Sequence, residues 1–253
     1  MRRAGLVSLR RNRRVAAGRG WATILVFHSL SRTDSHDGIT MSPDLFADIV
    51  RMLRTNYTVI PLTDLIGRVA QGIPFTGREV AITFDDGYLD NYEFAAPVLS
   101  DLGMPACFYL TAGFIGTERQ FPWDTAKGRR TVMMTWDNAR ELQRLGFEIG
   151  CHTWSHPDLG TEPIESVPRE LHDARAKIED ELGARIAHFA YPFGGLRNIR
   201  TEWVEAIREA GFASNARCHG GQVLAGDDPF WMAREGCHQR SPTDVRIILD
   251  DPW

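Results

Sequence analysis

Short apolar runs alternate along this chain with longer segments in which apolar residues recur every three or four positions. The short runs predict buried strands, and the periodic segments predict helices that pack one face against a sheet. Strands are expected at residues 22–27, 57–60, 80–84, 106–110, 147–151, 186–191, 212–216 and 230–237. Helices are expected at residues 43–53, 62–69, 92–102, 135–145, 168–182 and 201–210. The chain is therefore expected to be of α/β type.

The alternation of strands and helices also predicts how the strands pair. Strands connected through helices pair in parallel, and right-handed crossovers favour a closed or nearly closed barrel or a doubly wound sheet. In such folds the reacting groups gather at the carboxyl ends of the strands. The residues that could carry chemistry fall at these ends, namely His28, Asp85, Asp86, His152, His156 and Tyr191.

Asp85 and Asp86 follow the apolar run at 80–84 and precede Gly87. Adjacent carboxylates repel each other unless a cation or a proton lies between them. This favours a metal site in which one aspartate binds the ion and the other acts on a water molecule. The alternative is an Asp-Asp-Gly turn whose side chains cap the following helix.

His152 and His156 follow the apolar run at 147–151. Two imidazoles four residues apart can reach one ion from a tight loop, and Pro157 excludes a regular helix through the pair. Together with Asp86 they would leave one coordination position open for water. Zinc is the expected ion, and such a set also accepts cobalt, nickel or iron.

Three motifs carry a resemblance to a known family. They are Thr83-Phe84-Asp85-Asp86-Gly87, His152-Thr153-Trp154-Ser155-His156 and Phe189-Ala190-Tyr191-Pro192-Phe193-Gly194. In this order they resemble the NodB-homology polysaccharide deacetylases, carbohydrate esterase family four, over about residues 22–240. The resemblance implies a single-domain distorted (β/α) barrel of about seven parallel strands, which would occupy residues 21–253.

The resemblance also implies roles for individual residues. Asp85 would take a proton from the attacking water, and the backbone N–H of Tyr191 would stabilise the oxyanion. In the exopolysaccharide or poly-N-acetylglucosamine branch, an N-terminal strand that ends in Tyr-His supplies the general acid. The segment Phe27-His28-Ser29 resembles it, so His28 is the expected acid, with His238 and His219 as alternatives.

Two departures from the wider family bear on this assignment. The family often places an arginine near the third motif to orient the catalytic aspartate, and the segment His188-Phe189-Ala190 contains none. Arg234, on the last expected strand, is the candidate replacement, and an exterior salt bridge is its alternative role. The family's late Leu-x-His motif is also not evident. Both departures fit the exopolysaccharide branch better than chitin or peptidoglycan deacetylases.

Composition and charge exclude several classes of protein. The chain has 253 residues, of which 43% are apolar and 10% aromatic, and this argues against disorder. Seven arginines and no acidic residue lie in positions 1–20, so 22 basic residues face 33 acidic ones in the remainder. A nucleic-acid-binding body is therefore not expected. No stretch reaches the ~18 apolar residues of a transmembrane helix.

The basic leader, residues 1–20, contains no apolar run of signal-peptide length. It is expected to be a flexible tail, or alternatively an arginine-rich contact with an anionic membrane surface or a partner. The four cysteines form no Cys-x-x-Cys pair and are expected to be core residues in a reducing compartment, with two disulfides as the alternative. The cytoplasm is the expected location.

The motifs together predict a metal-dependent hydrolase that removes N-acetyl groups from an acetamido sugar or an N-acetylglucosamine-containing saccharide. An O-acetyl esterase or another amide hydrolase on the same scaffold is one alternative, and a non-catalytic carbohydrate-binding relative is another. Residues 113–130 form a polar, Gly-rich insertion, in which Trp123 either stacks on a sugar ring or anchors the loop.

Overall fold

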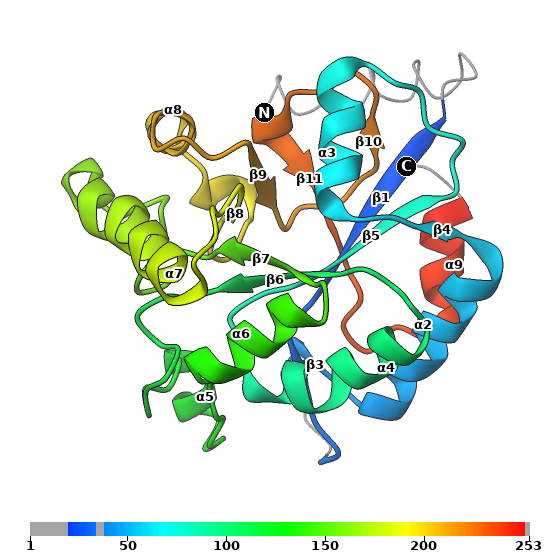
Figure 1. The fold of residues 1–253 in the computed structure, drawn as a ribbon, viewed down its shortest axis with the longest axis horizontal. Helices are drawn as coiled ribbons and strands as arrows, with labels where there is room; N and C mark the ends of the chain where they lie inside the picture. The colour runs from blue at the N-terminus through cyan, green and yellow to red at the C-terminus, as the bar shows by residue number, and fades with distance from the viewer. Residues whose placement is uncertain (1–19, 34–37, 251–253) are drawn as a thin grey trace.

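A computed structural model describes residues 20–33 and 38–250 (Figure 1). The strands are β1 (Trp21–Phe27), β2 (Ser29–Leu30), β3 (Thr40–Met41), β4 (Thr58–Val59), β5 (Glu79–Phe84), β6 (Cys107–Leu110), β7 (Glu148–Cys151), β8 (His188–Ala190), β9 (Ser214–Arg217), β10 (Val223–Leu224), β11 (Met232–Ala233) and β12 (Glu235–Gly236). The helices are α2 (Pro43–Asn56), α3 (Leu62–Gln71), α4 (Ala96–Asp101), α5 (Pro122–Ala126), α6 (Trp136–Arg144), α7 (Ala174–Leu182), α8 (Thr201–Glu209) and α9 (Pro242–Asp250). The leader at residues 1–19 lies outside the described part, so its expected roles stay predictions.

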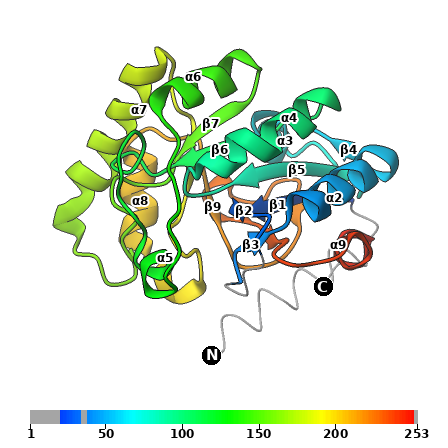
Figure 2. The same ribbon diagram turned by 90° about the horizontal axis from the view of Figure 1, so that it is seen from below.

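Parallel strands make up most of the sheet, in the order β1-β5-β6-β7-β8-β9-β11, and β10 runs antiparallel on β1. β1 and β5 share a long register, from Ala22 opposite Glu79 to Phe27 opposite Phe84. Figures 1 and 2 show most of the helices around the outside of these strands. The α/β prediction with parallel pairing is confirmed.

The sheet closes through the last strand, which changes partner at a single residue. β11 pairs with β9, and β12 pairs with β1, with Arg234 between them. The segment expected as one strand at 230–237 is therefore two short strands that follow a 3-10 turn. The described residues thus form a nearly closed barrel of seven parallel strands in which β11 and β12 together count as one, as expected.

Local signals place the helix ends where the sequence indicates. The Ser42 hydroxyl accepts a hydrogen bond from the Leu45 N–H at the start of α2, and Thr135 with Asn138 forms a capping box at α6. α7 ends at Gly183, whose φ of +63° is the left-handed conformation that glycine adopts without strain. These caps are local in sequence, which explains why they could be predicted.

Helix α3 covers the amino ends of two strands. The Glu148 carboxylate at the start of β7 accepts hydrogen bonds from the Leu62 and Thr63 N–H groups. His188 at the start of β8 lies 2.8 Å from the Thr63 hydroxyl. The first turn of α3 is therefore tied to the end of the barrel opposite the strand ends that carry the predicted site.

Several elements differ from expectation. The helices at 92–102 and 168–182 each begin with a π-helical segment, at Asn91–Ala95 and Pro168–Asp173. The insertion at 113–130 contains the short helix α5 and is not only loop. Helix α9 was not predicted, although its buried Val245, Ile248 and Leu249 have helical spacing. In the described residues no helix combines the length and apolar character needed to cross a bilayer.

Candidate metal centre and active site

The carboxyl ends of β1, β5 and β7 bring the predicted residues to one cleft. Its volume is about 310 Å³, and its lining includes His28, Asp86, Trp123, His156, Phe193 and His238. Segments that are far apart in sequence meet here because parallel strands present their carboxyl ends at the same edge. The structure thus brings His28 close to the three proposed metal ligands, Asp86, His152 and His156.

Asp86, His152 and His156 form a compact set of possible ligands. One donor atom from each lies within 4.8 Å of the others, and all three residues are buried. The Asp86 Oδ1 atom is 3.5 Å from His152 Nε2 and 3.3 Å from His156 Nε2. Among the described residues, neither carboxylate oxygen of Asp86 has a hydrogen-bond partner. Buried, unpaired oxygens beside two imidazoles fit a divalent cation.

The His152 ring is oriented by the backbone. Its Nδ1 atom lies 2.8 Å from the carbonyl oxygen of Ala190 at the end of β8. An N–H donated from Nδ1 leaves the lone pair on Nε2, the nitrogen that faces Asp86. The tautomer of neutral His152 that metal binding needs is therefore favoured by a neighbouring strand.

Backbone strain accompanies the ligand set. Asp86, Thr153 and His156 have φ values of +77°, +67° and +58°, in the left-handed region that side chains other than glycine rarely adopt. Such residues cost on the order of 1–3 kcal/mol each and persist only when their surroundings hold them. The loop from His152 to His156 must therefore be fixed by specific contacts.

Glu170 supplies several of those contacts. Its carboxylate accepts hydrogen bonds from the Trp154 N–H at 3.1 Å, the Ser155 N–H at 2.9 Å and the Ser155 hydroxyl at 2.8 Å. Glu170 is only 3% exposed, although the charges of an amphipathic helix usually lie on its solvated face, because the π-helical start of this helix packs against the histidine loop.

Arg234 makes a two-pronged ion pair with Asp85. Its Nη1 and Nη2 atoms each lie 2.7 Å from a different carboxylate oxygen, and Nη1 also donates to the Thr83 hydroxyl at 3.2 Å. Arg234 is 0% exposed, so the alternative of an exterior salt bridge is wrong. Burial acts to raise the pKa of Asp85, but the Arg234 guanidinium together with His152 and His28 lowers this pKa below its usual value.

Two histidine rings lie in edge contact at the cleft. The rings of His28 and His238 have centroids 4.8 Å apart, and His28 Nε2 lies 3.9 Å from an Asp85 oxygen. Burial lowers the pKa of His28, although the carboxylates of Asp86 and Asp85 oppose this. Burial and the neighbouring His28 lower the pKa of His238 to about 3. The third candidate, His219, is exposed and is not part of the cleft lining.

The prediction for Tyr191 needs correction. Its backbone N–H donates to the carbonyl oxygen of Ala216 at 2.9 Å, continuing the pairing between β8 and β9. That donor is already used in the sheet, so it is not free to stabilise an oxyanion. The sequence indicated where the residue falls along the strand, but not the partner of its N–H.

Sequence reasoning did not single out Phe193 or Cys218, and both line the cleft. Phe193 is 51% exposed, has a φ of +60°, and its ring centroid lies 4.8 Å from that of His156. The residue belongs to the third motif, and this was the signal that could have identified it. The other three cysteines, Cys107, Cys151 and Cys237, are buried and free, as expected for core residues.

Trp123 combines the two roles considered for it. Its indole stacks on Phe121 with a centroid distance of 4.5 Å, which anchors the insertion. It also lines the cleft, with its centroid 4.9 Å from that of the His156 ring. The insertion therefore contributes an aromatic wall to the cleft.

Comparisons with known proteins agree with this geometry. The family described as polysaccharide deacetylase matches residues 72–214. YxkH of Bacillus subtilis, whose name provisionally describes a polysaccharide deacetylase, is 25% identical over 190 residues, which are 75% of this chain and 61% of the relative. The poly-β-1,6-N-acetyl-D-glucosamine N-deacetylase of Escherichia coli is 30% identical over 87 residues, which are 33% of this chain and 13% of that protein. This chain thus spans less than two thirds of the length of each of these relatives.

A solved structure shows the same fold. The Streptococcus pyogenes deacetylase PplD in complex with acetate matches with a TM-score of 0.77 at 18% identity, over 92% of this chain and 100% of that one. At this identity the likeness concerns the fold alone. It confirms the distorted barrel predicted from the motifs.

Proposed function

This chain belongs to the polysaccharide deacetylase family, and on that basis we propose that it is a metal-dependent hydrolase that removes N-acetyl groups from an acetamido sugar and releases acetate. One observation carries the proposal. A buried set of two histidines and one carboxylate lies beside a second carboxylate that is held by an arginine. Hydrolysis of an unactivated amide needs both an electrophile and a base, and this cleft offers residues for each.

Asp86, His152 and His156 would hold the ion. When bound, a divalent cation polarises the acetyl carbonyl and lowers the pKa of a water molecule. The mixed nitrogen and oxygen donors suit zinc, and they also accept cobalt, nickel or iron. We propose zinc, because the donor set has the composition of zinc sites that keep one position open.

The remaining groups act on protons. Asp85 accepts a proton from the attacking water, since Arg234 keeps its carboxylate ionised and fixed in orientation. The C–N bond then breaks, and the amine nitrogen must gain a proton in order to leave. His28 is the proposed donor because it lies in the cleft, 3.9 Å from Asp85. The Tyr191 N–H has no part in these steps, because it is bonded to the Ala216 carbonyl.

The proposed substrate is a saccharide that contains N-acetylglucosamine. The named activity of the Escherichia coli relative supports this class. The aromatic rings of Trp123 and Phe193 at the cleft also suit the apolar faces of a sugar ring.

The decisive experiment measures metal content and acetate release on the same protein. Native protein and Asp86→Ala are compared for bound metal, and acetate release from N-acetylglucosamine oligomers is followed with and without a chelator. The exposed Asp101→Ala serves as the control for loss of a carboxylate.

We expect about one metal per chain in native protein and the control, its loss in Asp86→Ala, and acetate release that the chelator abolishes. Bound metal without acetate release from these oligomers would overturn the substrate class. Native protein that binds no metal would overturn the mechanism.

A further inference from the structure

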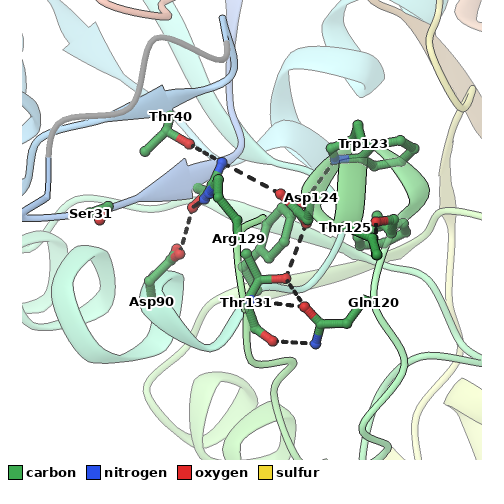
Figure 3. Close-up of polar contacts among 12 residues, drawn as sticks. Ser31, Thr40, Asp90, Gln120, Trp123, Asp124, Thr125, Arg129 and Thr131 are labelled. Atoms are coloured by element: carbon green, nitrogen blue, oxygen red, sulfur yellow. Dashed lines mark hydrogen bonds and ion pairs between the residues drawn. The ribbon is translucent and has the colours of Figure 1, made fainter. Parts of the chain in front are cut away.

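The insertion between β6 and α6 carries a second cluster of charged residues, outside the proposed metal set (Figure 3). Its centre is Asp124 on α5, which is 0% exposed. The Asp124 carboxylate accepts hydrogen bonds from the Tyr88 hydroxyl at 2.9 Å and the Thr131 hydroxyl at 3.0 Å. It also lies 3.4 Å from the Arg129 guanidinium. A buried carboxylate is costly to place unless it is paired and hydrogen-bonded, so loss of one of these partners leaves its charge poorly compensated.

Arg129 connects the insertion to the strand end that carries His28. It donates to the Thr40 hydroxyl at 2.8 Å and to the Ser29 hydroxyl at 3.1 Å, and Figure 3 shows it between Asp124 and Thr40. Ser29 in turn donates to Asp90 at 2.7 Å. The cluster therefore ties α5 to the residue that directly follows His28.

The same cluster reaches the cleft through one aromatic residue. The Trp123 indole N–H donates to the Tyr88 hydroxyl at 3.0 Å, and that hydroxyl donates to Asp124. A tyrosine hydroxyl can accept one hydrogen bond and donate another, so the chain from Trp123 to Asp124 is satisfied in a single direction. Asp124 must accept the Tyr88 hydroxyl proton for that proton to point away from the Trp123 indole.

We propose that Asp124 is a positioning residue, which fixes Trp123 as a wall of the substrate cleft and thereby determines how tightly the sugar binds. The identity of the bound sugar rests on the proposed function. Asp124 makes no hydrogen bond or ion pair with the metal set or with Asp85 among the described contacts, and Trp123 is the cleft residue that its hydrogen bonds reach through Tyr88. Replacing the carboxylate should weaken binding of substrate more than the chemical step.

The test is Asp124→Asn in the full chain, assayed for acetate release from N-acetylglucosamine oligomers. An amide keeps the size of the side chain but loses the ion pair with Arg129 and one of the carboxylate acceptors. We expect KM to rise about tenfold, with kcat within about twofold of native and metal content unchanged. Glu118→Gln, an exposed carboxylate in the same insertion, is the matched control and should leave KM unchanged.

A second comparison shows whether the effect passes through Trp123. Trp123→Phe should raise KM by a similar factor, and the double variant should be no worse than Trp123→Phe alone, because both changes remove the same wall. An unchanged KM in Asp124→Asn, a loss confined to kcat, or independent effects that multiply in the double variant would each overturn the proposal. If Asp124→Asn fails to fold, Thr131→Val removes one donor to the carboxylate and should raise KM in the same direction.

A measurement without substrate separates this proposal from the proposed function. Acrylamide quenching of Trp123, taken as the difference between native protein and Trp123→Phe, reports how exposed the indole is. The same difference is then taken between Asp124→Asn and the double variant that also carries Trp123→Phe. We expect acrylamide to quench Trp123 more strongly in this second comparison. Unchanged quenching would overturn the positioning role even if acetate release were never observed, whereas absent acetate release with increased quenching would count against the substrate assignment alone.

Discussion

Arg234 and Asp85 form a buried, two-pronged ion pair, with both nitrogen to oxygen distances at 2.7 Å. The residues lie 149 positions apart, because Arg234 lies between the two short strands that close the barrel and Asp85 directly follows β5. A planar guanidinium matches both carboxylate oxygens at once, so it fixes the orientation of Asp85 as well as its charge. Closure of the barrel is therefore what prepares the proposed base.

Replacing Arg234 by lysine tests this relationship. Lysine keeps the positive charge but cannot hold both oxygens, so Asp85 loses orientation and part of its stabilisation. We expect kcat to fall about 100-fold, with metal content retained. Because Arg234 lowers the pKa of Asp85, the acidic limb of the kcat profile should move to higher pH. Arg246→Lys, an exposed arginine paired with Asp250, is the control, and an unmoved acidic limb would contradict the prediction.

Glu170→Gln should weaken metal binding without removing a ligand. The amide keeps one acceptor oxygen for the histidine loop but loses the second, so the strained conformations of Thr153 and His156 are less well held. Residues that orient ligands typically contribute ~10–100-fold in metal affinity. Competition with a coloured chelator should show a loss of about tenfold or more. The exposed Glu165→Gln makes the same chemical change and should bind metal like native protein.

The two histidines in the cleft can be separated by kinetics. Burial lowers the pKa of both, that of His238 to about 3, and His28 is the one whose Nε2 lies 3.9 Å from the proposed base Asp85. His28→Asn should therefore lower kcat by ~100-fold or more, which is the usual contribution of a general acid. His238→Asn should act mainly on KM. Metal content measured on both variants controls for damage to the ligand set, and the opposite order of kcat losses would reassign the acid.

Asp90 should make stability depend on pH in an unusual direction. Burial raises its pKa to about 7, although the Leu30 N–H and the Ser29 hydroxyl donate to it. The folded protein therefore holds this proton more tightly than the unfolded chain, whose aspartate has a pKa near ~3.9. Asp90 therefore adds to the free energy of unfolding at low pH, and this contribution is lost as the pH rises through about 7.

Asp90→Asn removes this titration, and its amide can still accept from the Leu30 N–H and donate to the Ser29 hydroxyl. We compare the free energy of unfolding of native protein with that of Asp90→Asn. The native value should fall relative to the variant by about 1 kcal/mol or more between pH 5 and pH 8. This figure allows for solvent screening of part of the pKa shift. Urea titrations at both pH values measure it. Asp101→Asn, an exposed carboxylate, should show no such difference from native protein. A relative stability that does not change with pH would show that Asp90 titrates normally.

The ligand set was predictable because its signals are local. Asp86 and the two histidines each follow an apolar run directly, and parallel strands must bring such ends to one edge. Helix caps at Ser42 and Thr135 were predictable for the same reason, since a cap depends on residues within one turn. Helix α9 was missed even though Val245, Ile248 and Leu249 carry a helical pattern.

The contacts that support the site could not be predicted from local spacing. Sequence suggested Arg234 as a partner for Asp85, but only the closed barrel shows the paired bonds and the buried environment. The sequence also indicated where Tyr191 falls along its strand. It did not show that the Tyr191 N–H, the expected donor to the oxyanion, is bonded to the Ala216 carbonyl.

The sequence by itself determined which residues end each strand and which of them could bind a metal, because strand and helix periods are properties of neighbouring positions. The tertiary structure decided which distant side chains meet those ends. Glu170 under the histidine loop and Asp124 behind Trp123 both read as ordinary charges along the chain. They became buried acceptors only when packing brought donors from other segments to them, and no local pattern records that event.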